Sequence, residues 1–462
     1  MPVDPVALIV TSDSELLEHL GSAVASRCQL RAYPCSNIEA AEILLRGAGL
    51  GTVFLDLRPD HLLEGTAGFL ESLQSQKSKG VDLIAVSDGD LPIEVAVMAD
   101  LLAIRHLHAS LPEAEVNDVL DFVGGGGRVN GHRRAPEFRA LSVNNVSIMT
   151  YTPAMFATIE ELRRVAHRNV TLLLTGETGT GKTTMARMIH QLSDRARECF
   201  QHVACGALPS ELIESELFGH TRGAFTGADR AKMGRFEAAS RGTLLLDEID
   251  VLNPKEQVKL LRVLETGQFE PVGSLETRTS HARLIVASNV DLEDLVAAGD
   301  FRSDLYYRLN VLQFHLLPLK QRVLDIVPFA IQFVIDCCRE QNMRIDTISR
   351  DFLQTLKDYH WPGNLRELKN QIQRAVLFSS DGRLTRTDLN STVLDGGSSP
   401  HLRRLPPESS LADRVAVTEQ QILLQALREN DFNRTATARK LGLSRVGLYK
   451  KLRKHDLMER KS

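Results

Sequence analysis

The sequence predicts a multidomain α/β protein that ends in a small all-helical domain. Its 462 residues exceed one ordinary hydrophobic core and suggest about three domains. Two stretches rich in glycine and proline, near residues 124–127 and 396–407, divide the chain. Apolar runs alternate with helix-like spacing before the second stretch, whereas only helical spacing follows it.

These stretches define five segments. Glycine and proline at this density disfavour the interiors of helices and strands, so we interpret both stretches as linkers. The predicted organisation is an α/β domain at 1–123, a linker at 124–140, a larger α/β domain at 141–390, a linker at 391–410 and a helical domain at 411–462.

Composition excludes several classes of protein. Hydrophobic residues make up 43% and charged residues 25% of the chain, as in soluble globular proteins. The net charge of -4 means that any nucleic-acid site must come from local charge. The six scattered cysteines form no C-x-x-C pair, and no apolar window is long enough to span a bilayer. We therefore expect a cytoplasmic protein with reduced thiols and no membrane contact.

The first block has the pattern of a doubly wound α/β domain. Residues 7–10, 52–55 and 83–86 are short apolar runs, as expected of buried parallel strands. Helix-like spacing lies between them at 14–25 and 38–46. Strands that alternate with helices favour a parallel sheet covered on both faces.

The second block contains a phosphate-binding loop between a predicted strand and a predicted helix. Residues 170–175 form an apolar run, and the helix begins at Thr184. Backbone N–H groups of such a loop turn toward phosphates, and the helix adds its positive end. Lys182 should reach the β- and γ-phosphates of ATP. The loop residues are Gly176, Glu177, Thr178, Gly179, Thr180, Gly181, Lys182 and Thr183.

Two adjacent carboxylates end a second apolar run in the same block. Asp247 and Glu248 follow residues 243–246. Together with an upstream phosphate loop, this pattern predicts a Mg²⁺ site formed by Asp247 and the Thr183 hydroxyl. Glu248 would orient or deprotonate the attacking water.

Further motifs resemble one family: the sigma-54-dependent activators of the AAA+ class, also called the NtrC family or bacterial enhancer-binding proteins. The most diagnostic match is the hexapeptide G-A-F-T-G-A, which in the family tips a loop that contacts sigma-54. From composition alone it is a small-residue surface loop with one exposed aromatic side chain. The hexapeptide consists of Gly223, Ala224, Phe225, Thr226, Gly227 and Ala228.

The resemblance covers the whole second block and assigns further roles. It implies that Asn289 senses the γ-phosphate and that Arg366, at the start of a helix in a helical lid, contacts phosphate within the same subunit. It also implies that Arg302 and Arg308 reach the nucleotide of a neighbouring subunit. Fingers supplied in trans require a closed ring, which in this family is a hexamer or sometimes a heptamer.

Two positions depart from the family pattern. Thr183 follows the phosphate-loop lysine, where the family usually has an acidic residue, and this should not harm Mg²⁺ binding. The family commonly shows V-N-C-A-A-L on its second strand, and its asparagine tethers the catalytic glutamate. This chain has Ala204 there, within V-A-C-G-A-L, and alanine cannot hydrogen-bond Glu248. We expect hydrolysis to survive and its coupling to loop movement to change.

The last block predicts a DNA-binding helix-turn-helix. It carries a local charge of about +6 and three helical segments with a glycine turn. It resembles the Fis-type domain of the family, which binds enhancer DNA as a dimer at inverted half-sites. The candidate DNA contacts are Ser444 and Arg445 for bases, Lys450, Lys451, Arg453 and Lys454 for phosphates, and Arg434.

The first block resembles a degenerate response-regulator receiver. Asp56 stands at the phosphoacceptor position, but Thr11-Ser12 replace the expected acidic pair and the expected lysine is absent from 107–110. The alternatives are a structural dimerisation domain and control by a ligand, for example cyclic di-GMP held by linker arginines, as in some family members. Arginines in the linker are Arg128, Arg133, Arg134 and Arg139.

Three functions remain open at this point. The first is an ATP-hydrolysing activator of sigma-54 RNA polymerase, which assembles from dimers to hexamers. The second is a DNA-binding regulator whose ATPase acts as a nucleotide-gated assembly module, motivated by Ala204 and by the degenerate receiver. The third, a chelatase-like or helicase-like machine, gives no reason for the hexapeptide or for the terminal helix-turn-helix.

Overall fold

The computed structural model describes residues 6–28, 30–45, 50–76, 81–124, 137–144, 146–379 and 381–394. All of them belong to the first of two units of the chain, Met1–Gly396. The predicted helix-turn-helix lies outside the described residues. Within the described part of the chain, no helix is long and apolar enough to cross a membrane.

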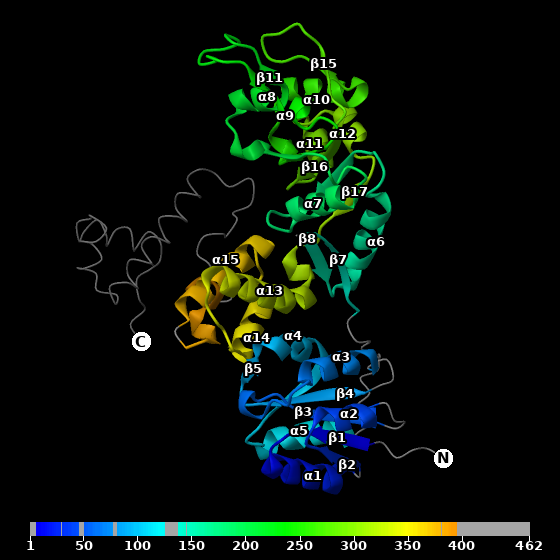
Figure 1. The fold of residues 1–462 in the computed structure, drawn as a ribbon, viewed down its shortest axis with the longest axis vertical. Coiled ribbons are helices and arrows are strands. Elements are labelled where there is room, and N and C mark those ends of the chain that lie inside the picture. The colour runs from blue at the N-terminus through cyan, green and yellow to red at the C-terminus, as the bar shows by residue number, and fades with distance from the viewer. Residues whose placement is uncertain are drawn as a thin grey trace, which may run out of the picture. The chain divides into compact units, whose positions relative to one another are not determined.

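The N-terminal domain is the predicted doubly wound α/β fold. Its parallel sheet has the strand order β2-β1-β3-β4-β6. Figure 1 labels the first four of these strands and the helices α1 to α5 around them. The strands are β1 (Val6–Val10), β2 (Arg31–Cys35), β3 (Leu50–Asp56), β4 (Asp82–Ser87) and β6 (Ala103–His108). The helices are α1 (Ser14–Cys28), α2 (Ile38–Leu45), α3 (Thr66–Gln76), α4 (Ile93–Leu102) and α5 (Glu113–Gly124).

Alternation along each strand explains why both faces of this sheet are covered. Ala7 and Ile9 of β1 pack in one core with residues of α1 and α5, and Leu8 and Val10 pack in another with α2, α3 and α4. A continuous apolar run such as residues 7–10 therefore suits a strand buried on both faces.

The second domain has its own parallel sheet, with the strand order β10-β13-β16-β9-β17. Leu172 and Leu174 pack toward α7, and Leu173 packs toward the opposite face. The strands are β9 (Leu172–Thr175), β10 (Phe200–Ala204), β13 (Thr243–Asp247), β16 (Arg283–Ser288) and β17 (Gln313–His315). The covering helices include α6 (Phe156–Val165), α7 (Lys182–Leu192), α8 (Ser210–Phe218), α10 (Pro254–Thr266), α11 (Leu292–Ala298) and α12 (Ser303–Leu309).

The boundaries of this domain differ from the sequence prediction at both ends. The antiparallel pair β7 (Arg139–Val143) and β8 (Val146–Thr150) begins inside the predicted linker 124–140. At the other end α16 (Ser391–Leu394) belongs to the lid, because Val393 is buried in the lid core. Periodicity could not place either boundary, because both elements are only four or five residues long.

A helical lid follows β17. It contains α13 (Val323–Gln341), α14 (Arg350–Asp358) and α15 (Asn364–Phe378), with the short strands β18 (Thr347–Ser349) and β19 (Arg383–Leu384). Trp361 is fully buried, and its indole N–H donates to the carbonyl oxygen of Leu356 at 2.7 Å. This bond satisfies the polar atom of the chain's single tryptophan.

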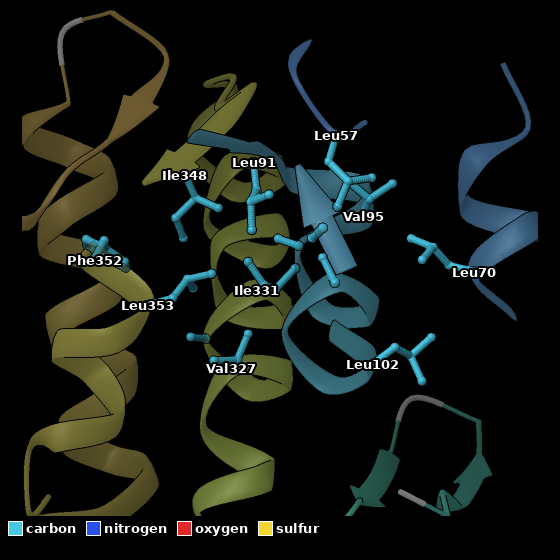
Figure 2. Packing of buried hydrophobic residues seen from close by; sticks show 14 of the residues in the cluster. Leu57, Leu70, Leu91, Val95, Leu102, Val327, Ile331, Ile348, Phe352 and Leu353 are labelled. Carbon is cyan, nitrogen blue, oxygen red and sulfur yellow. The ribbon is translucent and has the colours of Figure 1, made fainter. Parts of the chain in front are cut away.

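The N-terminal domain is joined to the lid by a shared sheet and a shared core. Strand β5 (Asp90–Pro92) pairs antiparallel with β18, with Leu91 opposite Ile348. Figure 2 shows Leu91 beside Ile348 and near Ile331 of α13. The sequence did not predict this joint, because β5 has three residues and its partner lies more than 250 positions away.

Candidate nucleotide-binding site

The phosphate loop lies between β9 and α7, as the sequence predicts. Gly176, Gly179 and Gly181 all have positive φ, at 141°, 80° and 105°. Only glycine adopts such conformations at low cost, so the loop can turn its backbone without strain. Gly181 forms the N-cap of α7, which directs the positive end of that helix into the loop.

Lys182 is 5% exposed and uses all three ammonium hydrogens within the site. Its Nζ donates to the carbonyl oxygens of Gly176 at 2.7 Å and Glu177 at 3.1 Å. The third bond goes to Asn289 Oδ1 at 2.6 Å. Burial lowers the pKa of Lys182, and nearby carboxylates, Asp247 first, oppose this effect.

The predicted Mg²⁺ ligands lie together. Thr183 Oγ1 donates to Asp247 Oδ2 at 3.2 Å. Both groups are hard oxygen ligands of the type that Mg²⁺ prefers, so these residues fit that ion. Burial alone would raise the pKa of Asp247, but His202, Thr183 and Lys182 together lower it. His202 Nε2 lies 3.6 Å from Asp247 Oδ2, a neighbour that sequence reasoning missed.

Asn289 connects Lys182 to Glu248, the predicted catalytic residue. Its Nδ2 donates to Glu248 Oε1 at 3.0 Å while its Oδ1 accepts from Lys182. Asn289 follows β16, the strand between β13 and β9 in the sheet, which places it between the two groups. Ala204 has no side-chain donor, so in this structure Asn289 makes the hydrogen bond to Glu248 that the resemblance expects from an asparagine at position 204.

A cavity of about 440 Å³ brings the predicted groups together. It is large enough for a nucleotide-sized ligand. Residues 178–184, Asp247, Glu248, Asn289 and Arg366 line it. Sequence reasoning missed the polar residues Arg322 and Lys369 and the apolar wall, because no motif marks them. The apolar wall includes Ile148, Met155, Ile159, Phe329, Phe333 and Leu365.

The lid bonds to three successive carbonyl groups of the phosphate loop. Asn364 Nδ2 donates to the Thr178 oxygen at 3.0 Å, and the Leu365 amide donates to the Gly179 oxygen at 3.0 Å. Arg322, which precedes α13, donates to the Thr180 oxygen at 3.3 Å. A side chain at Gly179 would collide with the Gly363 carbonyl at 2.2 Å. The lid is therefore in backbone contact with the loop that would hold phosphate.

The two predicted finger arginines do not line this cavity. Arg302 forms a two-point ion pair with Asp304, at 3.0 and 2.7 Å. Arg308 makes a long bond of 3.4 Å to the Leu264 oxygen. Arg366, in contrast, lines the cavity of its own chain. The trans role of Arg302 and Arg308 stays a prediction.

The G-A-F-T-G-A hexapeptide lies in a loop between β11 (Gly219–His220) and β12 (Lys232–Met233). Phe225 is 37% exposed, and its ring meets that of His220 edge-on at 4.9 Å. Beside it runs a second loop between β14 (Gln268–Phe269) and β15 (Arg278–Thr279), joined by the Thr221 amide to the Val272 oxygen. Leu275 in this second loop is fully exposed, which sequence reasoning missed.

Asp56 lies at the end of β3 as expected, and both of its oxygens are already bonded. Arg58 Nη2 donates to Oδ2 at 2.8 Å and its Nε to Oδ1 at 3.0 Å. Thr11 Oγ1 donates to Oδ2 at 2.7 Å, and Arg58 also reaches Asp13 at 2.7 Å. Asp56 is 3% exposed. A resident guanidinium thus neutralises the predicted phosphoacceptor, and the phosphoacceptor role stays a prediction.

The remaining predicted sites are only partly described. Of the linker arginines, Arg139 begins β7, where it pairs with Glu137 at 3.3 Å and lies over the Phe156 ring at 5.2 Å. Arg128, Arg133 and Arg134 lie outside the described residues, as do all the candidate DNA contacts. All six cysteines are free thiols, as expected.

Comparison with protein families matches three successive regions. Residues 148–315 match the Sigma-54 interaction domain, and residues 320–404 match the AAA+ ATPase lid domain. Residues 414–455 match the Bacterial regulatory protein, Fis family. The first two matches cover the nucleotide cavity and the lid, and the third covers the predicted helix-turn-helix.

Three relatives show how far the similarity extends. The regulatory protein AtoC of Escherichia coli (strain K12) is 40% identical over 67% of this chain and 68% of its own. The Nif-specific regulatory protein of Azotobacter vinelandii is 42% identical over 64% of this chain and 56% of its own. HoxA of Bradyrhizobium diazoefficiens is 43% identical over 66% of this chain and 63% of its own. The match spans less than two thirds of the last two proteins.

A solved structure resembles the whole chain. NtrX from Brucella abortus in complex with ADP has a TM-score of 0.50, covering 98% of this chain and 100% of that chain. Its sequence identity is 24%, so the likeness concerns the fold.

Proposed function

The chain belongs to the family of sigma-54-dependent transcription regulators, and we propose that it hydrolyses ATP in a ring oligomer to remodel RNA polymerase that carries sigma-54. The observation that carries this proposal is the single cavity lined by the phosphate loop, the Asp247-Glu248 pair, Asn289 and Arg366. In the same domain lies the loop with the G-A-F-T-G-A hexapeptide.

The residues of the cavity have distinct roles in the proposed hydrolysis. Lys182 would exchange a protein acceptor for phosphate oxygens, and the positive end of α7 would add to the attraction. Thr183 and Asp247 would hold Mg²⁺, which neutralises charge on the phosphates when bound. Glu248 would orient the attacking water and accept its proton as ADP leaves. Arg366 would contact phosphate from the lid.

A ring would complete each site from a neighbouring subunit. Arg302 and Arg308 lie away from the cavity of their own chain, which supports a role in trans. Such arginines contribute about 10³–10⁵ in rate in related phosphoryl transfer. We propose that dimers assemble into hexamers through a closed head-to-tail interface.

The other ends of the molecule supply the partners. We propose that the Fis-type region binds inverted repeats of enhancer DNA, with Arg445 among the base contacts. Sigma-54 would bind the loop that carries Phe225. Cytoplasmic location follows from these partners.

Control of the ATPase has two candidate routes. Arg58 occupies the carboxylate of Asp56, which favours a ligand or a partner over phosphorylation. Cyclic di-GMP is one candidate ligand, and Arg139 would have to leave Glu137 and Phe156 to bind it. Saturable binding of cyclic di-GMP in calorimetry would support this route, and no detectable heat would exclude it.

A second function is favoured by one observation, the alanine at position 204. In that alternative the ATPase domain binds nucleotide only to gate assembly of a DNA-binding regulator. ATP hydrolysis by the purified chain separates the two functions, because the assembly module requires binding without turnover.

An open-complex assay tests the sigma-54 proposal. With sigma-54 polymerase, ATP and a sigma-54 promoter, we expect Phe225→Ala to abolish open complexes and to retain most ATP hydrolysis. The matched control is Phe378→Ala, which removes a more exposed phenylalanine at the end of α15 and should change neither. Open complexes formed by Phe225→Ala at the wild-type level would contradict the proposal.

A further inference from the structure

The carboxylate of Glu248 lies in a defined position between Asn289 and Gly206, which we call its seat. Glu248 has φ of 58°, in the left-handed region, and directly follows β13. Its Oε1 accepts the Asn289 amide, and its other oxygen faces the backbone of Gly206. Strand β10 ends at Ala204 and runs parallel to β13, with Ala204 opposite Asp247. Gly206 lies in the short 3-10 turn that follows, Cys205–Ala207.

The seat exists because residue 206 is glycine. A Cβ added at Gly206 would lie 1.9 Å from Glu248 Oε2 and 3.0 Å from its Cδ. The carboxylate thus fills the volume that any other side chain would occupy. The colliding atoms are the far end of a flexible side chain, and Gly206 has no left-handed φ. An alanine would therefore displace the carboxylate and leave the backbone intact.

The other described side chains next to Glu248 do not hydrogen-bond its carboxylate, so Asn289 is the residue that holds it. Ala204 offers no hydrogen bond, and Cys205 is buried, which raises the pKa of its thiol to about 12 and keeps it neutral. Within the described residues, Asn289 is the one side chain that the structure bonds to the carboxylate of Glu248.

The tether is connected to the nucleotide site through Lys182. Its three ammonium hydrogens bond to two loop carbonyls and to Asn289 Oδ1. A phosphate oxygen can gain Lys182 only when one of these acceptors gives it up. Asn289 is the acceptor on a movable side chain, and losing the lysine frees its amide to rotate away from Glu248.

We propose that Gly206 and Asn289 form a resting seat for Glu248, and that phosphate binding at Lys182 releases the glutamate from it. Gly206 and Asn289 are positioning residues, since they act through Glu248. The seat does in this chain what position 204 cannot do. The inference rests on the proposed ATP hydrolysis and specifies what keeps Glu248 from activating water before ATP binds.

Crystal structures test the release of Glu248 from its seat independently of turnover. We expect a non-hydrolysable ATP analogue with Mg²⁺ to move Lys182 onto phosphate and to break the 3.0 Å contact between Asn289 Nδ2 and Glu248 Oε1. In nucleotide-free Gly206→Ala the same contact should be absent. Persistence of the contact in either structure would overturn the proposal, whether or not the chain hydrolyses ATP.

Nucleotide affinity provides the second readout. Because nucleotide binding must displace Glu248 from its seat in the wild type, Gly206→Ala should tighten binding of a non-hydrolysable ATP analogue with Mg²⁺ about two- to tenfold, which is the equivalent of one hydrogen bond. Adding Ala204→Asn should return the affinity toward the wild-type value, because an asparagine at 204 supplies a new tether. The control Gly68→Ala, on the open surface of α3, should match wild type. An affinity for the ATP analogue that is unchanged or weaker in folded Gly206→Ala would overturn the seat.

Discussion

Arg58 changes what can happen at Asp56. The carboxylate is buried, and the guanidinium and Thr11 bond to both of its oxygens. The bond to Asp56 and, to a lesser extent, that to Asp13 raise the pKa of Arg58. Phosphoryl transfer to an aspartate needs an exposed oxygen and a divalent cation held by carboxylates. Here a fixed cation already stands between Asp56 and Asp13.

We therefore expect no phosphorylation of Asp56. The full chain incubated with acetyl phosphate and Mg²⁺ should gain no phosphate at Asp56, as measured by intact mass after brief exposure. Asp56→Asn, which cannot form an acyl phosphate, sets the background. Stoichiometric labelling of the wild type with no labelling of Asp56→Asn would contradict this prediction and would show that Arg58 can leave the Asp56 carboxylate.

Removing Arg58 should destabilise the N-terminal domain. Arg58→Ala leaves a buried carboxylate without its cation, which typically costs about 3 kcal/mol. Hydrogen exchange of β1 and β3 amides in the full chain measures this local free energy of unfolding. Arg105→Ala is the matched control: its ion pair with Asp118 is exposed, so a loss below about 1 kcal/mol is expected. Equal losses of local free energy in the two variants would mean that the buried Arg58–Asp56 pair contributes no more than an exposed ion pair.

At this scale the sequence predicts residues fixed by local motifs and misses those fixed by tertiary contacts. Lys182, Thr183 and Asp247 follow from strand-loop-helix spacing and lie where expected. The bonds from Arg58 to Asp13 and from Asn289 to Glu248 depend on how side chains that follow different strands meet. Spacing along the chain contains no information on such contacts.

Among the elements, the joint between the N-terminal domain and the lid links two predicted modules. Besides the β5–β18 pairing, Lys357 of α14 pairs with Asp100 of α4 at 2.5 Å, and Arg383 pairs with Asp90 at 2.7 Å. Helix α13 packs against both α4 and α15. Arg322, just before α13, and Asn364, the first residue of α15, donate hydrogen bonds to the phosphate loop. A continuous chain of contacts through the lid helices therefore joins the N-terminal domain to the nucleotide site.

A charge swap tests the joint. Asp100→Lys places two cations together at its edge, so amides of β5 and β18 should exchange about fivefold faster in the full chain. The double variant Asp100→Lys with Lys357→Asp restores opposite charges and should recover the wild-type rates. Asp118→Lys, away from the lid, is the control. Exchange that is equal in wild type and Asp100→Lys would mean that the pairing contributes nothing to the joint.

Element prediction succeeds where the apolar pattern is long and fails where it is short. The runs at 7–10, 52–55 and 243–246 correspond to β1, β3 and β13. Strand β5 ends in proline and has three residues, so its partner strand in the lid, and not its own propensity, creates it. Strand β7 and helix α16 extend the second domain into both predicted linkers for the same reason.

For the whole molecule, a ring completed in trans requires that no subunit completes its own catalytic site. Glu248 and Lys182 lie in one cavity, whereas Arg302 and Arg308 lie away from it. A subunit with an intact cavity and no finger, and a subunit with a finger and no base, should therefore complement each other. The assay needs only purified chain, ATP and Mg²⁺.

The most direct measurement is ATP hydrolysis by mixtures of Glu248→Gln and Arg302→Ala across a concentration series, beside wild type. We predict that wild-type specific activity rises steeply with concentration, that each variant alone is nearly inactive, and that their mixture regains activity because Arg302 of one subunit serves Glu248 of the next. A wild-type activity independent of concentration, or an Arg302→Ala chain as active as wild type, would contradict a ring completed in trans.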